Sequence, residues 1–239
     1  MAVAGPIIAH RGASAVKPEN TISAFEEARA AGCGWIELDA QALDDGAVIV
    51  MHDHTLQRTT DGTGPVAMAD LAAIRSLRTR DPKTKALTDE GVPTLEDALA
   101  FCSETGIGMV LEIKATWGVD ADDARAVTET LPTMPDFPLL VTSFSVTALA
   151  TVAELRPDMA LGLAVLRPPR DPVAAKNALG LSAVHCNAEW TSAEDITAMH
   201  AAELDVAVAT INDASVAQRF LSAGADGIMT DWPNLLESE

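Results

Sequence analysis

The stretch LLVTSFSVTALATVAELRPDMALGLAV, residues 139–165, contains the structural unit that decides the fold of this chain. Its first four residues, Leu139 to Thr142, form a short apolar run of the kind found in buried strands. Residues 145–155 predict a helix, and residues 159–165 predict the next strand. A strand, a helix and a second strand in this order predict parallel pairing of the two strands.

The same unit repeats on both sides of this stretch. The other predicted strands cover residues 6–10, 34–40, 108–114, 183–187, 206–211 and 226–230, and a further extended run covers residues 47–51. Eight strand–helix units in 239 residues predict an α/β fold of the closed TIM (β/α)₈ barrel type. The structural alternative is an open doubly wound sheet, but no GxGxxG or GxxxxGK[ST] loop follows any predicted strand to support it.

Residues 53–93 interrupt the repeat. This segment is long, polar and rich in Gly, Thr and Arg, with one amphipathic piece near residues 68–77. Long segments between regular elements of a compact domain are usually functional lids or insertions. We therefore expect a single barrel domain over residues 1–239, with residues 53–93 inserted after the second strand as a cap over the barrel mouth.

Composition and charge restrict the possible partners. The net charge of −19 argues against nucleic acid and against stable association with anionic membranes, because both require clustered Lys and Arg. No apolar run is long enough to span a bilayer, residues 1–10 do not resemble a signal peptide, and three cysteines without a CxxC pair predict reduced thiols. These features predict a cytoplasmic protein with a small-molecule substrate and leave its oligomeric state open.

Polar side chains collect where the early strands end. Glu37 and Asp39 alternate with Leu38, so they point to one face of their strand, and Glu112 and Lys114 share a face of the next barrel strand. Neighbouring carboxylates repel one another unless a cation lies between them. Three carboxylates from adjacent strands predict a site for one divalent metal ion, Mg²⁺ or Ca²⁺.

Two histidines and two basic residues stand at the same strand ends. His10 follows the first strand and His52 follows the extended run at residues 47–51. Cleavage of a phosphodiester needs a base for the attacking oxygen and an acid for the leaving oxygen, which two histidines can supply. Arg11 and Lys114 can bind the phosphate oxygens and stabilise the charge of the transition state.

Ordered motifs give a family resemblance. The runs are HRGASAVKPENTISAF (10–25), IELDAQ (36–41), MHDHTLQRTTDGTG (51–64), LEIK (111–114) and GADGIMTDWP (224–233). In this order they resemble the glycerophosphodiester phosphodiesterase family from residue 7 to residue 233.

The resemblance implies a barrel that hydrolyses glycerophosphodiesters to glycerol 3-phosphate and an alcohol, with attack by a glycerol hydroxyl through a cyclic phosphate. The residue roles it implies are His10 and His52 as the acid–base pair, Arg11 and Lys114 on the phosphate, and Glu37, Asp39 and Glu112 on the metal. Ala209, where members often have Trp, and Trp232, where they have Tyr, depart from the pattern.

The remaining polar residues have simpler interpretations. The main role expected of Asn20 is to cap the first helix, and the resemblance implies that the PENT turn around it also shapes the site. His185 and His200 are interpreted as structural, and Asp226 and Asp231 as residues that shape the last strand and its turn. Arg58 is equally compatible with a substrate contact and with a polar lid.

Two other functions compete with the diesterase. One is a non-catalytic barrel that binds phosphorylated ligands, since a fold alone does not prove catalysis. The other is a related phospholipid phosphodiesterase acting at a membrane. Residues 53–93 contain no Trp, Phe or Tyr to insert into a bilayer, which favours a soluble substrate.

Overall fold

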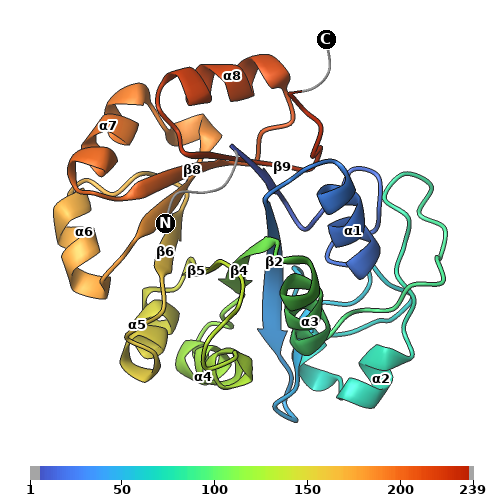
Figure 1. Ribbon diagram of the computed structural model, residues 1–239. Helices are drawn as coiled ribbons and strands as arrows, with labels where there is room; N and C mark the ends of the chain where they lie inside the picture. The colour runs from blue at the N-terminus through green and yellow to red at the C-terminus, as the bar shows by residue number, and fades with distance from the viewer. Residues whose placement is uncertain (1–5, 237–239) are drawn as a thin grey trace.

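The computed structural model describes residues 6–236, and these residues form a barrel of strands enclosed by helices (Figure 1). The strands are β1 (Ile7–Ala9), β2 (Trp35–Ala42), β3 (Val48–Val50), β4 (Gly108–Ile113), β5 (Leu139–Ser143), β6 (Leu161–Val165), β7 (Ala183–Asn187), β8 (Asp205–Ala209) and β9 (Gly227–Thr230).

Pairing between the first two strands closes the barrel. The order around the sheet is β1-β9-β8-β7-β6-β5-β4-β2, and β1 also pairs with β2. All of these neighbours are parallel. The predicted TIM barrel is confirmed and the open sheet is excluded. β3 pairs antiparallel with the end of β2, so it extends the sheet outside the barrel wall.

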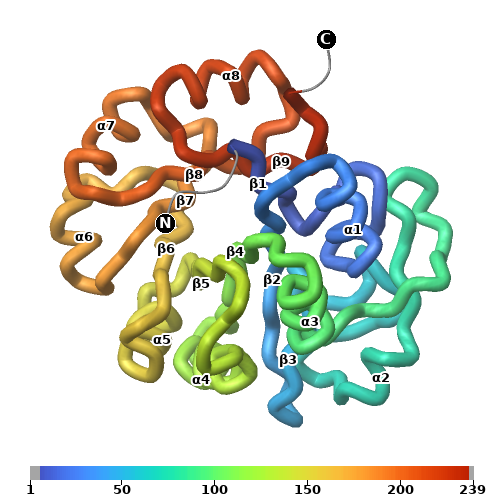
Figure 2. Tube along the Cα trace, in the orientation of Figure 1, coloured from blue at the N-terminus to red at the C-terminus, as the bar shows by residue number. Residues whose placement is uncertain are grey.

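Helices surround the barrel on its outer side (Figure 2). They are α1 (Ile22–Ala30), α2 (Leu71–Arg75), α3 (Leu95–Thr105), α4 (Asp120–Thr130), α5 (Val146–Leu155), α6 (Pro172–Leu179), α7 (Ala193–Ala201) and α8 (Ala214–Ser222), with 3₁₀ turns η1 (Val66–Met68) and η2 (Ala188–Trp190). No helix within residues 6–236 has both the length and the apolar character needed to cross a bilayer.

The expected cap of α1 is wrong. Thr21, not Asn20, is the N-cap, and its side chain accepts a hydrogen bond from the backbone N–H of Ala24 at 3.3 Å. Asn20 has a φ of 59° and directs its side chain to Asp39 instead. The two residues are adjacent and Asn is the slightly better capping type, but Thr21 has the extended backbone conformation of an N-cap and Asn20 does not.

The barrel interior changes character along β2. Trp35, Glu37 and Asp39 alternate with outward residues, so all three point inward. Trp35 packs with Ile8 and Val110 in an apolar interior cluster. It fits because Gly108 opposite has no side chain: a Cβ there would lie 2.5 Å from the indole. The interior is therefore apolar at the start of the strands and charged at their carboxyl ends.

The inserted segment lies beside the barrel and has a small core of its own. Leu56, Val66 and Ile74 pack there against Ile49 of β3. The insertion runs along one rim of the mouth, where Lys83 Nζ lies 5.7 Å from the centre of the Trp232 ring. The apolar residues of the segment face β3, and the segment borders the mouth of the barrel. Its role as a cap stays a prediction.

The extent of the domain stays a prediction. Residues 1–5 and 237–239 lie outside the described residues. The prediction that residues 1–10 are not a signal peptide falls partly on them.

Candidate active site

Three carboxylates meet at the carboxyl end of β2 and β4. Glu37 and Asp39 are 2% and 1% exposed, and Glu112 lies directly beside Asp39 in the parallel register. Each residue contributes an oxygen atom, and these atoms lie within 4.8 Å of one another. Hard divalent cations prefer clustered carboxylate oxygens of this kind.

The charge balance of the cluster also fits a cation. Burial, followed by the charge of Asp39, raises the pKa of Glu37 to about 8. The same two causes raise the pKa of Glu112. Burial acts on Asp39 as well, but Lys114 and Arg11 outweigh it and lower the pKa of this carboxyl. Two basic side chains, Lys114 and Arg11, thus lie against three clustered carboxylates, and a divalent ion would balance the remaining negative charge.

Two basic side chains border the cluster. Lys114 Nζ donates to Glu112 Oε1 at 2.5 Å and lies 3.1 Å from Asp39 Oδ1. Arg11 donates its backbone N–H to Glu37 Oε2 at 2.9 Å. Its Nε lies 3.3 Å from Asp39 Oδ2, yet the alignment is too poor for a hydrogen bond, so this buried N–H has no partner. The contact between this group and Asp39 is therefore an ion pair without a hydrogen bond.

His10 is held by a carboxylate from the opposite end of the chain. Its Nδ1 lies 2.7 Å from Asp231 Oδ1, and Asp231 also accepts hydrogen bonds from Ser14 and Asn212. Burial alone would raise the pKa of Asp231, but these hydrogen bonds lower it to about 2. Burial lowers the pKa of His10, while Asp231 and Glu37 raise it by more. The ring is therefore oriented by a permanent negative charge.

His52 is held in the same way by its neighbour in the sequence. Its Nδ1 lies 2.7 Å from Asp53 Oδ1. Arg58 donates to both oxygens of Asp53, at 2.6 and 2.8 Å, and to both oxygens of Glu19, at 2.6 and 2.8 Å. Glu19 also accepts from Arg11 at 2.7 Å. Arg58 thus ties the start of the insertion to the loop after β1.

A tight loop after β1 sets the positions of its polar residues. Arg11 and Gly12 have φ values of 55° and 75°, and a Cβ on Gly12 would lie 2.6 Å from the backbone of Ala24. Only glycine fits at such a close approach with positive φ. The left-handed Asn20 donates from Nδ2 to Asp39 Oδ2 at 2.8 Å and so fixes one carboxylate of the cluster.

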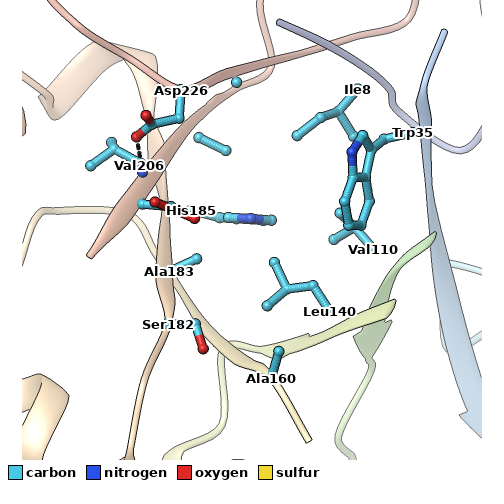
Figure 3. Close-up of a pocket in the computed structure, with 13 residues that line it drawn as sticks. Ile8, Trp35, Val110, Leu140, Ala160, Ser182, Ala183, His185, Val206 and Asp226 are labelled. Atoms are coloured by element: carbon cyan, nitrogen blue, oxygen red, sulfur yellow. Dashed lines mark hydrogen bonds between the residues drawn. The ribbon is translucent and has the colours of Figure 1, made fainter. Parts of the chain in front are cut away.

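A pocket of about 190 Å³ contains all seven predicted site residues. His185 lies on its floor and also lines a smaller cavity of about 30 Å³ toward the start of the strands. Figure 3 shows the ring of His185 extending across the barrel interior between Leu140 and the apolar residues around Trp35. Burial lowers the pKa of His185 to about 4, so its ring is neutral at pH 7.

The expectations for the other polar residues are met in part. Asp226 shapes the start of β9, accepting a hydrogen bond from the N–H of Val206 at 2.7 Å (Figure 3). It also pairs with His200 at 2.8 Å. The sequence predicts that Asp231 only shapes the last strand and its turn, but its carboxylate also binds Nδ1 of His10. Arg58 does not line the pocket, and its side chain donates hydrogen bonds to Asp53.

The partners of the histidines are what reasoning from the sequence missed. Asp53 directly follows His52, and Asp231 and Asn212 stand at strand ends, so a signal was present for each. The pairing of Asp231 with His10 spans 221 residues, and only closure of the barrel between β1 and β9 creates it.

A closed barrel with an acidic cluster, two carboxylate-bound histidines and two basic residues in one pocket defines a barrel hydrolase of the phosphodiesterase class. The family model for the glycerophosphoryl diester phosphodiesterase family matches residues 10–235. The chain belongs to this family and is an enzyme of the glycerophosphodiester phosphodiesterase type.

Known proteins resemble the chain over nearly its full length. YhdW of Bacillus subtilis is 30% identical over 238 residues, which cover 96% of both chains. A glycerophosphodiester phosphodiesterase of Caldanaerobacter subterraneus is 29% identical over 96% of this chain and 95% of its own. A phosphodiesterase of Oleispira antarctica, solved with the product sn-glycerol-3-phosphate, is 31% identical with a TM-score of 0.92, covering 98% of this chain and 95% of that one.

Proposed function

We propose that this enzyme hydrolyses glycerophosphodiesters to glycerol 3-phosphate and an alcohol, with one divalent metal ion, Mg²⁺ or Ca²⁺, and with His10 and His52 as its acid–base pair. The observation that carries the proposal is the convergence of three carboxylates, two basic side chains and both histidines on one pocket. The product bound in the Oleispira relative supports glycerol 3-phosphate as the common product.

The two histidines are equipped for matched proton transfers. Each ring is bound through Nδ1 to a carboxylate, and no hydrogen bond to either Nε2 occurs within residues 6–236. Both Nε2 atoms are therefore free to face a substrate in the pocket that the rings line. One histidine removes the proton of the glycerol hydroxyl that attacks the phosphorus, while the other protonates the oxygen of the leaving alcohol. The two histidines exchange roles when water opens the resulting cyclic phosphate.

Arg11 and Lys114 balance the charge of the phosphate. Their positive groups lie beside Asp39 and remain charged, because carboxylates raise the pKa of both more than burial lowers it. They are positioned to stabilise the extra negative charge of the transition state. Glu37, Asp39 and Glu112 would hold the metal, which supplies Lewis acidity at a phosphoryl oxygen when bound.

Release of glycerol 3-phosphate from a panel of glycerophosphodiesters tests the activity. We expect release with Mg²⁺ or Ca²⁺ and its loss with a chelator. The panel also tests the alternative of a phosphate-binding barrel without catalysis: phosphate-ester binding without cleavage of any diester would favour that alternative. Faster cleavage of vesicle phospholipids than of any water-soluble diester would favour the phospholipid phosphodiesterase.

Substitution separates the two kinds of residue. We expect His10→Ala to lower turnover by about 10² or more with metal affinity unchanged, because it removes a proton-transfer group. Glu37→Gln should weaken metal affinity by about tenfold or more, because it removes a ligand charge. Calorimetric titration with metal and steady-state kinetics measure both. Full turnover in His10→Ala would refute the acid–base assignment, and unchanged metal affinity in Glu37→Gln would refute the metal site.

A further inference from the structure

The pocket consists of two chemically different halves. His10, Arg11, His52 and the acidic cluster with Lys114 form a charged half on the β1, β2, β3 and β4 side. The opposite half comes from the ends of β5 to β9 and contains no Asp, Glu, Lys or Arg among the described residues that line it. Its apolar residues are Phe144, Ala164, Val165, Leu166, Ala209 and Met229, and its other lining residues are Thr142, His185, Cys186, Asn187 and Thr210. A diester with two different organic groups on one phosphate therefore meets two different surfaces.

Hydroxyl content decides which organic group takes which half. Glycerol carries two free hydroxyls, which need hydrogen-bond partners when they leave water. The charged half provides such partners and contains the histidines that must reach a glycerol hydroxyl. The alcohol is then left with the apolar half.

No charge in this apolar half can pair with a cationic alcohol. None of its residues that line the described pocket is Asp, Glu, Lys or Arg, and burial keeps the ring of His185 neutral at pH 7. Two of the carboxylates across the pocket, Asp39 and Glu112, already pair with Arg11 and Lys114. A quaternary ammonium or amine would lose its hydration here without gaining a counter-charge.

The aromatic ring of this half is also unsuited to a cation. Lys114 Nζ lies 5.9 Å from the centre of the Phe144 ring, and Asp39 and Glu112 hold it there. A second cation against Phe144 would be repelled by the first. Trp190 does not line the pocket, and its ring is already 3.9 Å from the guanidinium of Arg167. The overall charge of −19 attracts cations, but that field is screened within about 10 Å and acts less than a charge inside the pocket.

We propose that the enzyme selects glycerophosphodiesters whose alcohol is uncharged and apolar, and that Phe144 and Leu166 determine this specificity. The proposal rests on the proposed function. Phe144 is 54% and Leu166 is 63% exposed, so both present apolar surface at the entrance that a substrate can cover.

Two esters of equal shape test the proposal. Glycerophosphocholine and its 3,3-dimethylbutyl analogue differ only in the replacement of the positive nitrogen by carbon. We expect kcat/KM for the uncharged ester to be at least about tenfold higher. Equal or faster cleavage of the choline ester would overturn the specificity while leaving the proposed function intact. Cleavage of neither ester would overturn this inference, and it would overturn the proposed function as well if no other diester of the panel were cleaved.

Two substitutions locate the preference in the apolar half. Leu166→Glu should shift the ratio of the two kcat/KM values toward the choline ester by about threefold, because it adds a counter-charge at an exposed site. Leu166→Gln has nearly the same size and should not shift it. Phe144→Ala should lower kcat/KM for the uncharged ester by about tenfold and for the choline ester by less. If the ratio of the two kcat/KM values is unchanged in both Leu166→Glu and Phe144→Ala, the assignment of the specificity to these residues is overturned. Circular dichroism verifies that each variant is folded.

Discussion

At the scale of single residues, two carboxylates orient the two histidines of the candidate site. Asp231 and Asp53 each bind Nδ1 of a histidine, which leaves Nε2 for the proposed proton transfer. The role of Asp231 is the easier of the two to test. Hydrogen bonds lower its pKa to about 2, so the carboxylate stays charged at every pH used in an assay.

Asp231→Asn should lower turnover by about 10² without changing metal affinity, because it weakens the orientation of His10. Since the charge of Asp231 raises the pKa of His10, its removal should also move the His10 limb of the kcat/KM–pH profile to lower pH. Kinetics between pH 5 and pH 9 measure both effects.

A matched control exists at the other end of the barrel. Asp226 pairs with His200 at 2.8 Å, so Asp226→Asn makes the same chemical change to a His–Asp pair outside the active-site pocket. It should leave the pH profile unmoved. If the two variants behave alike, Asp231 has only a structural role.

At the scale of elements, the first residues of the insertion contact the candidate active site. Arg58 lies between Asp53, which holds His52, and Glu19 of the loop after β1. Its pKa is raised above the ordinary value by these two carboxylates, so it stays charged. The apolar residues of the insertion pack against β3. This packing holds the segment that carries Arg58 in place.

Arg58→Ala should lower kcat by about tenfold and change the melting temperature little. The side chain is 47% exposed, so its ion pairs add little stability, but Asp53 would no longer be held in place. Steady-state kinetics and thermal denaturation monitored by circular dichroism measure the two effects.

Arg78 provides the comparison, because it is another exposed arginine of the insertion that pairs with an aspartate, Asp61, at 3.5 Å. Arg78→Ala should retain wild-type kcat. Equal losses in the two variants would mean that any weakening of the insertion slows the enzyme, and that Arg58 has no special link to His52.

At the scale of the whole molecule, the buried acidic cluster costs stability that a bound metal would restore. A group whose folded pKa is raised stabilises the fold while it is protonated, and this contribution is lost as the pH rises toward that pKa. Glu37 has a folded pKa of about 8 against an ordinary value of 4.5, and Glu112 is shifted in the same direction. The lowered pKa of Asp39 acts only below pH 4.

Metal should therefore raise the melting temperature more at pH 8 than at pH 6. A metal concentration of 100 times Kd should raise it by about 5 °C or more at pH 8, from about 2.7 kcal/mol of binding free energy. Thermal scans with and without Mg²⁺ at both pH values give the result. Glu37→Gln should show a smaller difference between the two pH values, and equal metal effects at pH 6 and pH 8 in the wild type would contradict the linkage.

The sequence by itself determined the barrel and the seven residues that line its charged half. Apolar runs alternating with helical segments are local signals, and so is the two-residue spacing of Glu37 and Asp39, so both can be read without tertiary information. The ordered motifs added the family, because each motif is a short continuous run.

Only the tertiary structure decided which groups support these residues. Asp231 reaches His10 because β9 pairs with β1, and Arg58 reaches Glu19 because the insertion packs beside β3. The rim position of the insertion and the division of the pocket into two halves arise in the same way. These contacts join residues 39 to 221 positions apart, and such distances along the chain carry no local periodicity from which a contact could be predicted.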